Sequence, residues 1–285
     1  FTQIHRPFVW DSSNLSETGR VIGGEKIKFR LEKKGNALRF IKLVPKAFLD
    51  KAIYPVFTDD SATYYSGAGD GSVSGFFSST DWSTTRGSST GSAVNYTGTK
   101  AHGGYATKQD DNTYGIYRLF LPFDTSGLPD TATITDAVLS VYSEIVKITA
   151  NPSGERYSVV VQTTQASNTE LTTADFDTGL GTSKGSNDVN ATANQYNNWT
   201  LNATGISWIS KTGYTKLGIM VGFDYDNVAP EKADSEAGLV NSRMSEYADT
   251  GSDPYLSVTY SEATTTTSSS TTSSTSTSSS TSSSS

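Results

Sequence analysis

The stretch Tyr117–Tyr142, YRLFLPFDTSGLPDTATITDAVLSVY, decides the fold. Leu119, Leu121 and Phe123 occupy every second position in its first part, and a similar alternation of apolar and polar residues returns at 137–142. A period of two is that of a β-strand with one buried face. The connection TSGLPDTAT is rich in Gly, Pro, Asp, Ser and Thr, which favour turns. The stretch therefore predicts two β-strands joined by a turn.

Further strands are expected at 157–162, 216–223 and 255–260, where β-branched, aromatic and other apolar residues recur with the same period. One short helix is expected at 203–211, because Ile206, Trp208 and Ile209 form a partial apolar face before Gly213. No longer helical pattern occurs in the sequence. The chain therefore predicts an all-β fold, an antiparallel β-sandwich of jelly-roll type with one short helix.

The main β-sandwich is expected to span residues 59–262. Residues 1–58 contain a lysine-rich hairpin pattern around the turn KKGN and a short helical turn after Pro45, and they resemble the C-terminal remnant of a preceding β domain. The Gly-, Ser- and Asn-rich segments 66–112 and 177–198 are expected to be loops. Residues 263–285, almost entirely Ser and Thr, predict a disordered linker or an O-glycosylated stalk. The start at Phe1 suggests a piece of a longer protein.

Composition argues against several classes of function. The chain has no cysteine, and its two histidines, His5 and His102, are far apart in sequence, which disfavours a thiol nucleophile or a multi-histidine metal site. The net charge of −7 and the absence of a basic cluster disfavour nucleic-acid binding. No apolar run is long enough to predict membrane insertion. No catalytic motif stands out, so we expect a protein that is not an enzyme.

Calcium is the only metal that the sequence suggests. Asp110, Asp111 and Asn112 offer the oxygen ligands that calcium prefers, and the DYDN segment at 224–227 offers a second set. Neither segment has the spacing of an EF-hand loop, and short Asp/Asn clusters commonly form turns. A structural calcium ion and simple turns remain alternative interpretations of both segments.

Three motifs of the sequence resemble those of a known family. The opening stretch matches the pattern R-x-hydrophobic-x-FD-x-S-x-LP of DNRLRE-type domains, which are β-sandwiches of secreted microbial proteins similar to carbohydrate-binding modules. The segments WTLNATGISWISKTGYTKLGIMV at 199–221 and SRMSEYADTGSDPYLSVTY at 242–260 are similar to the family's helix-and-strand unit and closing strand. The resemblance covers about half of the chain. It implies an extracellular module with a role in carbohydrate binding, adhesion or stalk building.

A sugar-binding surface is expected around Trp82, because its polar surroundings contain no apolar pattern that would bury it. Aromatic faces, nearby amides and charged groups are the usual means of carbohydrate recognition. The predicted ligand-binding residues are Trp82, Arg86, Asp81, Tyr64, Tyr65 and Tyr96.

Other prominent residues are expected to be structural. Arg118 lies on the strand face opposite Leu119 and Leu121, where it predicts either a guanidinium that grips an acidic sugar or, more simply, an ion pair with Glu246 or Asp124. Trp199 and Trp208 fall within the helix-and-strand unit and are expected in the core.

The function expected from these observations is a non-catalytic, extracellular or cell-surface module that binds polysaccharide or a surface glycan, or mediates adhesion, within a larger protein. One alternative is a structural spacer without a ligand. Another is the accessory module of a polysaccharide-degrading enzyme whose catalytic domain lies elsewhere. An exposed Trp82 favours binding, and a buried Trp82 favours the spacer.

Overall fold

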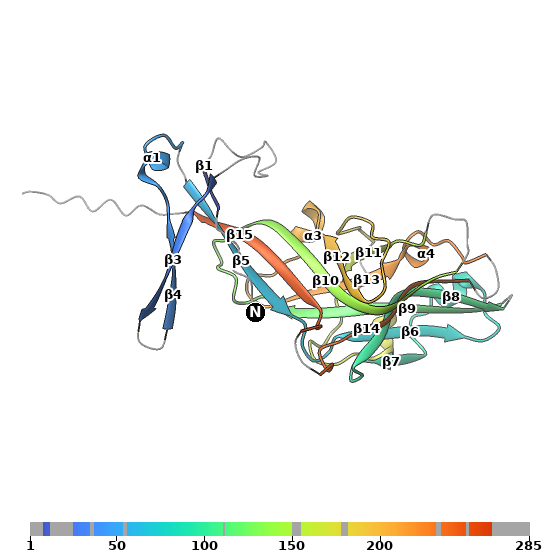
Figure 1. Cartoon of the computed structure of the whole chain (residues 1–285). Helices are drawn as coiled ribbons and strands as arrows, with labels where there is room; N and C mark the ends of the chain where they lie inside the picture. The colour runs from blue at the N-terminus through green and yellow to red at the C-terminus, as the bar shows by residue number, and fades with distance from the viewer. Residues whose placement is uncertain are drawn as a thin grey trace, which may run out of the picture.

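The computed structural model describes residues 8–11, 25–34, 37–53, 56–110, 112–149, 155–177, 182–231, 235–248 and 251–263. The fold is all-β, antiparallel and sandwich-like, as the sequence predicted (Figure 1). The strands are β1 Phe8–Asp11, β2 Glu25–Lys26, β3 Lys28–Lys34, β4 Ala37–Leu43, β5 Val56–Tyr65, β6 Gly71–Phe77, β7 Ala93–Asn95, β8 Lys100–Asp110, β9 Thr113–Asp124, β10 Thr133–Ile148, β11 Ser158–Gln162, β12 Gln195–Thr200, β13 Tyr214–Val221, β14 Ser235–Arg243 and β15 Tyr255–Ala263. The helices are α1 Lys46–Leu49, α2 Trp82–Arg86, α3 Ala203–Ser207 and α4 Gly222–Tyr225, with a 3₁₀ turn η2 at Thr173–Phe176.

One continuous ladder of hydrogen bonds joins most of the strands. Its order is β11-β13-β9-β8-β14-β10-β15-β5-β1-β2, with β12 beside β10 and the pair β6-β7 beside β9. The ladder folds over on itself, because side chains from strands far apart in this order share one apolar core. Leu121 of β9 and Val160 of β11 belong to the same buried cluster as Leu139 of β10 and Leu256 of β15. The fold is therefore a sandwich whose two layers are joined along one edge.

The opening stretch forms the centre of this sandwich. Strands β9 and β10 contain the two segments predicted from the alternation, and the turn between them is closed by backbone bonds from Leu128 to Thr125 and from Ala132 to Pro129. Leu119, Leu121 and Phe123 enter the inner core. Phe120, at the opposite parity, belongs to a second cluster on the outer face of β9. Both faces of β9 are thus buried.

The prediction of loops at 66–112 is wrong, because this segment contains β6, β7, β8 and α2. The alternation of large apolar residues is weak in segment 66–112, because close packing requires small residues there. A Cβ atom on Gly75 of β6 would lie 2.5 Å from the ring of Phe176. In β14, which pairs with β8, Gly238 has a φ of +126°, and a Cβ there would meet the carbonyl of Gly104 in β8. Strands built on glycine lack the β-branched alternation that identifies a strand in sequence.

The helices are more numerous than predicted. Helix α3 confirms the expected helix at 203–211 in shorter form, and α1 follows Pro45. Helices α2 and α4 and the turn η2 were not predicted, since each has only four or five residues and no helical period can be recognised over so short a span. Residues 222–223, expected at the end of a strand, begin α4. Within the described ranges, no helix has the length and apolar character needed to cross a membrane.

The N-terminal segment forms the expected hairpin, β3-β4, at one end of the molecule (Figure 1). Strand β1 pairs with β5, and β5 runs without a break through positions 58 and 59 to pair with β15. The expected boundary between the two segments therefore falls inside a strand. The Ser/Thr tract at 264–285 lies outside the described residues.

Candidate functional site

Arg118 is the centre of a buried charge network. Its side chain is 4% exposed and forms two hydrogen bonds with the carboxylate of Asp224, at 2.7 Å from Nε and 2.9 Å from Nη2. The remaining guanidinium donors reach the backbone carbonyls of Phe176 and Arg86, and the Phe176 ring lies 4.1 Å from the guanidinium carbon. A bidentate pair of this kind holds both groups in one geometry. Arg118 therefore joins β9 to α2, η2 and α4.

The prediction that Arg118 forms an ion pair with Asp124 or Glu246 is wrong. Asp124 faces the same side of β9 as Arg118 but lies six residues further along the strand, roughly 20 Å away. It is exposed and accepts hydrogen bonds from the hydroxyl and then the backbone N–H of Ser126, which lower its pKa. The true partner, Asp224, is 106 residues distant in sequence and sits on a helix that was not expected.

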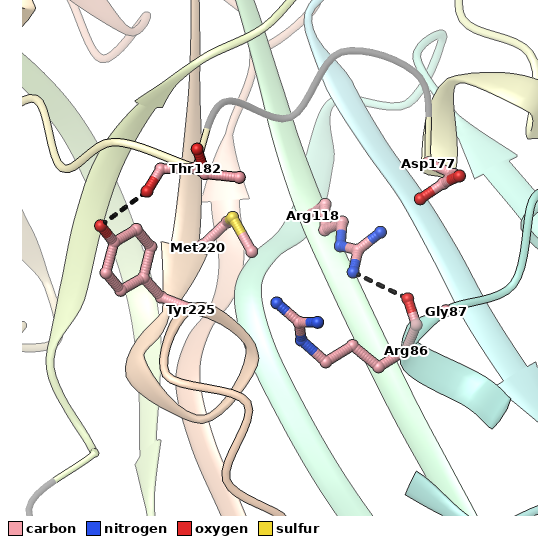
Figure 2. Close-up of a pocket in the computed structure, with 7 residues that line it drawn as sticks. All are labelled: Arg86, Gly87, Arg118, Asp177, Thr182, Met220 and Tyr225. Carbon is pink, nitrogen blue, oxygen red and sulfur yellow. Dashed lines mark hydrogen bonds between the residues drawn. The ribbon is translucent and has the colours of Figure 1, made fainter. Parts of the chain in front are cut away.

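Arg86 stands beside this pair and borders a pocket. Its Nε donates to the carbonyl oxygen of Asp224 at 2.7 Å and lies 3.3 Å from the Asp224 carboxylate. Among the described residues, its two terminal Nη groups have no hydrogen-bond partner. They extend toward a cavity of about 260 Å³, which we call the arginine pocket (Figure 2). It is lined by Arg86, Gly87, Arg118, Asp177, Thr182, Met220 and Tyr225.

The prediction that Trp82 is exposed is wrong, because only 7% of the residue is accessible. Its ring packs edge-on against Tyr114 at 5.7 Å, and its Nε1 donates to the side chain of Asn227 at 3.2 Å. The polar sequence around Trp82 hid this role, since the apolar partners come from β9 and from the loop after α4 rather than from neighbouring residues. Trp82 is a core residue that fixes α2 over the sheet.

The remaining predicted binding residues do not form one surface with Trp82. Asp81 caps α2 by accepting the backbone N–H of Thr84 at 2.7 Å, a bond that lowers its pKa. Tyr96 packs on the outer-face cluster with Trp82. Tyr64 and Tyr65, as neighbours in a strand, point to opposite faces of β5. Tyr64 packs on the inner core, whereas Tyr65 is 49% exposed.

Tyr65 belongs to an aromatic surface that the sequence did not reveal. Its ring lies 6.0 Å from Tyr255, which lies 5.2 Å from Tyr196, which in turn lies 5.5 Å from Tyr142. We call these four residues the tyrosine row. They come from β5, β15, β12 and β10, and the rings of Tyr196 and Tyr255 meet across β10 where Ser140 is small and buried.

A signal for the tyrosine row was present in the sequence. Tyr142 alternates with Val141, and Tyr255 precedes Leu256, so both occupy positions that face away from the core. What the sequence lacked was the strand order that brings these positions together.

Charged groups extend the tyrosine row at one end. Arg243 places its guanidinium carbon 4.4 Å from the ring centre of Tyr142 and 4.1 Å from that of Tyr247. Glu144 is paired with Lys100 at 2.6 Å and with Arg243 at 3.1 Å, and the bond from Lys100 is the main cause of its lowered pKa. The hydroxyl of Tyr196 donates to the backbone carbonyls of Gly251 and Asp253, which holds its ring in place.

Trp199 and Trp208 have the structural roles that were predicted. Trp199 is completely buried, and its indole N–H donates to the carbonyl oxygen of Ser158 at 3.1 Å. Trp208 is partly buried, packs on the inner core and covers Gly185, where a Cβ atom would lie 2.1 Å from its ring.

Glu246 lies near a second buried carboxyl group, Asp70. Asp70 has no exposed surface and accepts hydrogen bonds from Ser66 and from the backbone and hydroxyl of Ser245. Burial, with a contribution from the charge of Glu246, raises the pKa of Asp70 to about 7. Oε2 of Glu246 is buried without a hydrogen-bond partner in the described part of the chain.

The two segments considered for calcium are occupied by other interactions. Asp110 accepts the backbone N–H of Asn112 at 2.9 Å, as in a turn, and Asp111 lies outside the described residues. In the second segment, Asp224 binds Arg118, Asp226 accepts the Tyr157 hydroxyl, and Asn227 binds Trp82. Within the described ranges, no three His, Asp or Glu side chains gather in a metal-binding arrangement. Calcium stays a prediction.

His102 lies in an aromatic group on β8 and β9, with ring centres 6.0 Å from Tyr105 and 5.5 Å from Tyr117. Its Nδ1 accepts the backbone N–H of Asn241 at 3.4 Å, and burial lowers its pKa. The neighbouring Tyr105 donates its hydroxyl to Glu236. These contacts fix the rings in the sheet. His5 lies outside the described residues.

A comparison of the sequence with protein-family models finds no family that matches the chain, and a comparison with curated proteins finds no match. The resemblance to DNRLRE-type domains thus stays a prediction that rests on the three motifs.

Proposed function

We propose that this protein is a non-catalytic module that binds polysaccharide through the tyrosine row. The observation that carries the proposal is the unbroken chain of ring contacts from Tyr65 to Tyr142 on the outward face of a rigid sheet. Tyrosine combines an apolar ring, which packs on the C–H faces of a sugar, with a hydroxyl that exchanges hydrogen bonds with it. Rings held by their neighbours lose little conformational freedom on binding.

The geometry of the row favours a single flexible chain as the ligand. Neighbouring rings are tilted by 56° to 88° rather than coplanar, so they present both faces and edges. Such a surface fits separate sugar units better than the flat face of a crystalline polymer. The charged group of Lys100, Glu144 and Arg243 lies beside Tyr142 and supplies polar contacts for hydroxyl groups.

The wider setting of the proposal is an extracellular or cell-surface protein of which this module is one part. The Ser/Thr tract and the resemblance to domains of secreted proteins support that setting. The alternative of a structural spacer is favoured by one specific observation, the burial of Trp82, which removes the tryptophan first expected to contact a ligand.

A glycan array separates the two functions. The full chain and the double variant Tyr65→Ala/Tyr255→Ala are applied to plant, algal and microbial polysaccharides. We expect the full chain to bind at least one polysaccharide and the double variant to lose that signal. Failure of the full chain to bind any of them would overturn the proposal and leave the spacer. The variant Tyr214→Ala is the control, because Tyr214 is 39% exposed and has no ring contact among the described residues.

A further inference from the structure

The arginine pocket lies on the outer face of the other layer, away from the tyrosine row. Arg118 points away from the inner core on β9, and Tyr142 points away from the same core on β10. Helix α2 and α4 with the turn η2 enclose the Arg118 side, and the pocket opens between them (Figure 2). A ligand in this pocket therefore makes its contacts independently of the row.

Beneath the pocket, two arginines, Arg86 and Arg118, share the single carboxylate of Asp224. The carboxylate of Asp224 is 1% exposed, accepts two hydrogen bonds from Arg118 and lies 3.3 Å from Nε of Arg86. Arg86 reaches the same residue only through Nε, and its side chain is 31% exposed. Its planar guanidinium carries four further N–H donors on Nη1 and Nη2 at the edge of the cavity, and the bond from Nε fixes the orientation of that plane.

An opposite charge stands at the edge of the pocket. Asp177 lines it, is exposed, and forms no ion pair with either arginine within the described residues. A simple inorganic anion gains from Arg86 but is repelled by Asp177. A ligand that carries a carboxylate and hydroxyl groups on one small ring satisfies both, because the carboxylate accepts from Arg86 and the hydroxyls donate to Asp177.

The other lining groups agree with a sugar ring of that type. Met220 and the ring of Tyr225 supply apolar surface, and the Tyr225 hydroxyl is fixed by its bond to the carbonyl of Thr182 at 3.1 Å (Figure 2). A cavity of about 260 Å³ is below the usual range for larger ligands and suits one ring.

We propose that the arginine pocket binds the carboxylate of a uronic acid residue of an acidic polysaccharide, with Arg86 as the carboxylate-binding residue. The module then carries two sugar-binding surfaces on opposite layers, one built from tyrosine rings and one specific for acidic units.

The test uses the full chain labelled with ¹⁵N and three probes: glucuronate, galacturonate and mannuronate trisaccharides, each also as its methyl ester. The Nε–H signal of Arg86 reports on the pocket directly. We expect at least one acidic trisaccharide to shift this signal and to bind at least tenfold more tightly than its ester. If no acidic probe shifts the Arg86 signal, the proposal is overturned.

Variants separate the pocket from general charge attraction. Arg86→Gln is expected to weaken binding of the acidic trisaccharide at least tenfold, whereas Arg30→Gln, on the exposed hairpin strand β3, stays within twofold. Equal loss in both variants would contradict the proposal. Should Arg86→Gln fail to fold, Arg86→Lys takes its place, because lysine keeps the charge without the planar fork of arginine. If Arg86→Lys prefers the acidic trisaccharide over its methyl ester as strongly as the parent does, the role assigned to Arg86 is contradicted.

Further arms identify the source of the anion and keep the two surfaces apart. Inorganic sulfate or a sulfated trisaccharide binding as tightly as the uronates would replace the carboxylate proposal by a general anion site. Tyr65→Ala is expected to leave the Arg86 signal unchanged. If Tyr65→Ala loses binding on the array and no acidic probe shifts the Arg86 signal of the parent, the proposal for the tyrosine row stands and the proposal for the arginine pocket is overturned.

Discussion

The two outer faces of the sandwich each hold a carboxylate between two cations, but in different surroundings. On one face Asp224 joins Arg118 and Arg86 beneath α2 and α4, with its side chain 1% exposed. On the other, Glu144 joins Lys100 and Arg243 beside the tyrosine row, with its side chain 19% exposed. The same chemical arrangement is therefore centred on a buried carboxylate on one face and on a partly exposed carboxylate on the other. Burial, rather than residue type, makes the difference.

The largest expected effect on stability follows from removing the buried ion pair between Arg118 and Asp224. Asp224→Ala leaves Arg118 buried without its carboxylate partner, and we expect the free energy of unfolding to fall by about 3–5 kcal/mol. Urea denaturation followed by circular dichroism measures the loss. The matched variant Glu144→Ala should cost less than about 1 kcal/mol, because its partners, Lys100 and Arg243, are partly exposed to solvent. Similar losses in the two variants would show that burial does not separate the two faces.

A second variant tests how the covered face is held. Trp82→Ala removes a buried ring that packs on Tyr114 and binds Asn227, and we expect a loss of about 3 kcal/mol in unfolding free energy. Tyr65→Ala, which removes a half-exposed ring from the open face, should cost clearly less. Thermal and urea unfolding of both variants give the comparison. A Trp82→Ala protein as stable as the parent would mean that the ring is not part of the core.

A third prediction concerns a buried carboxyl group that no cation pairs with in the described residues, Asp70. Its pKa is about 7 in the folded state against an ordinary value of 3.8. Between these values the folded protein keeps a proton that the unfolded chain has released. The contribution of Asp70 to the free energy of unfolding is therefore fully present below pH 3.8. It falls as the pH rises from 3.8 to about 7, by up to about 1.4 kcal/mol per pH unit.

Asp70→Asn removes this titration while preserving the shape of the side chain. Its unfolding free energy should change less between pH 4 and pH 7 than that of the parent, measured by urea denaturation across that range. Identical pH profiles for the two proteins would contradict the raised pKa of Asp70.

The sheet interior could be predicted from the sequence because its signal is local. Alternation at Leu119, Leu121 and Phe123 reports directly on a buried strand face. The helix at α3 was also predictable, since Asn202 caps it and Ile206 begins its apolar face. Strands β6 and β8 were missed because glycine is required where layers approach closely, as at Gly75 beneath Phe176.

The candidate sites could be predicted only in part, because they depend on strand order. Arg118 and Arg86 were identified as prominent, but their shared partner, Asp224, lies more than 100 residues further along the chain. Tyr65 was identified alone, without the three tyrosines that adjoin it in space. Trp82 was assigned by its polar neighbours in sequence, whereas Tyr114 and Asn227, which enclose it, lie outside that segment.

A change in binding free energy tests the central claim most directly. Isothermal titration compares the affinity of the parent, Tyr65→Ala and Tyr214→Ala for the strongest polysaccharide ligand of the array. We predict that Tyr65→Ala weakens binding by at least about 1 kcal/mol, or roughly fivefold, as expected for one aromatic contact, and that Tyr214→Ala leaves it unchanged. Equal affinity in all three proteins would contradict binding through the tyrosine row.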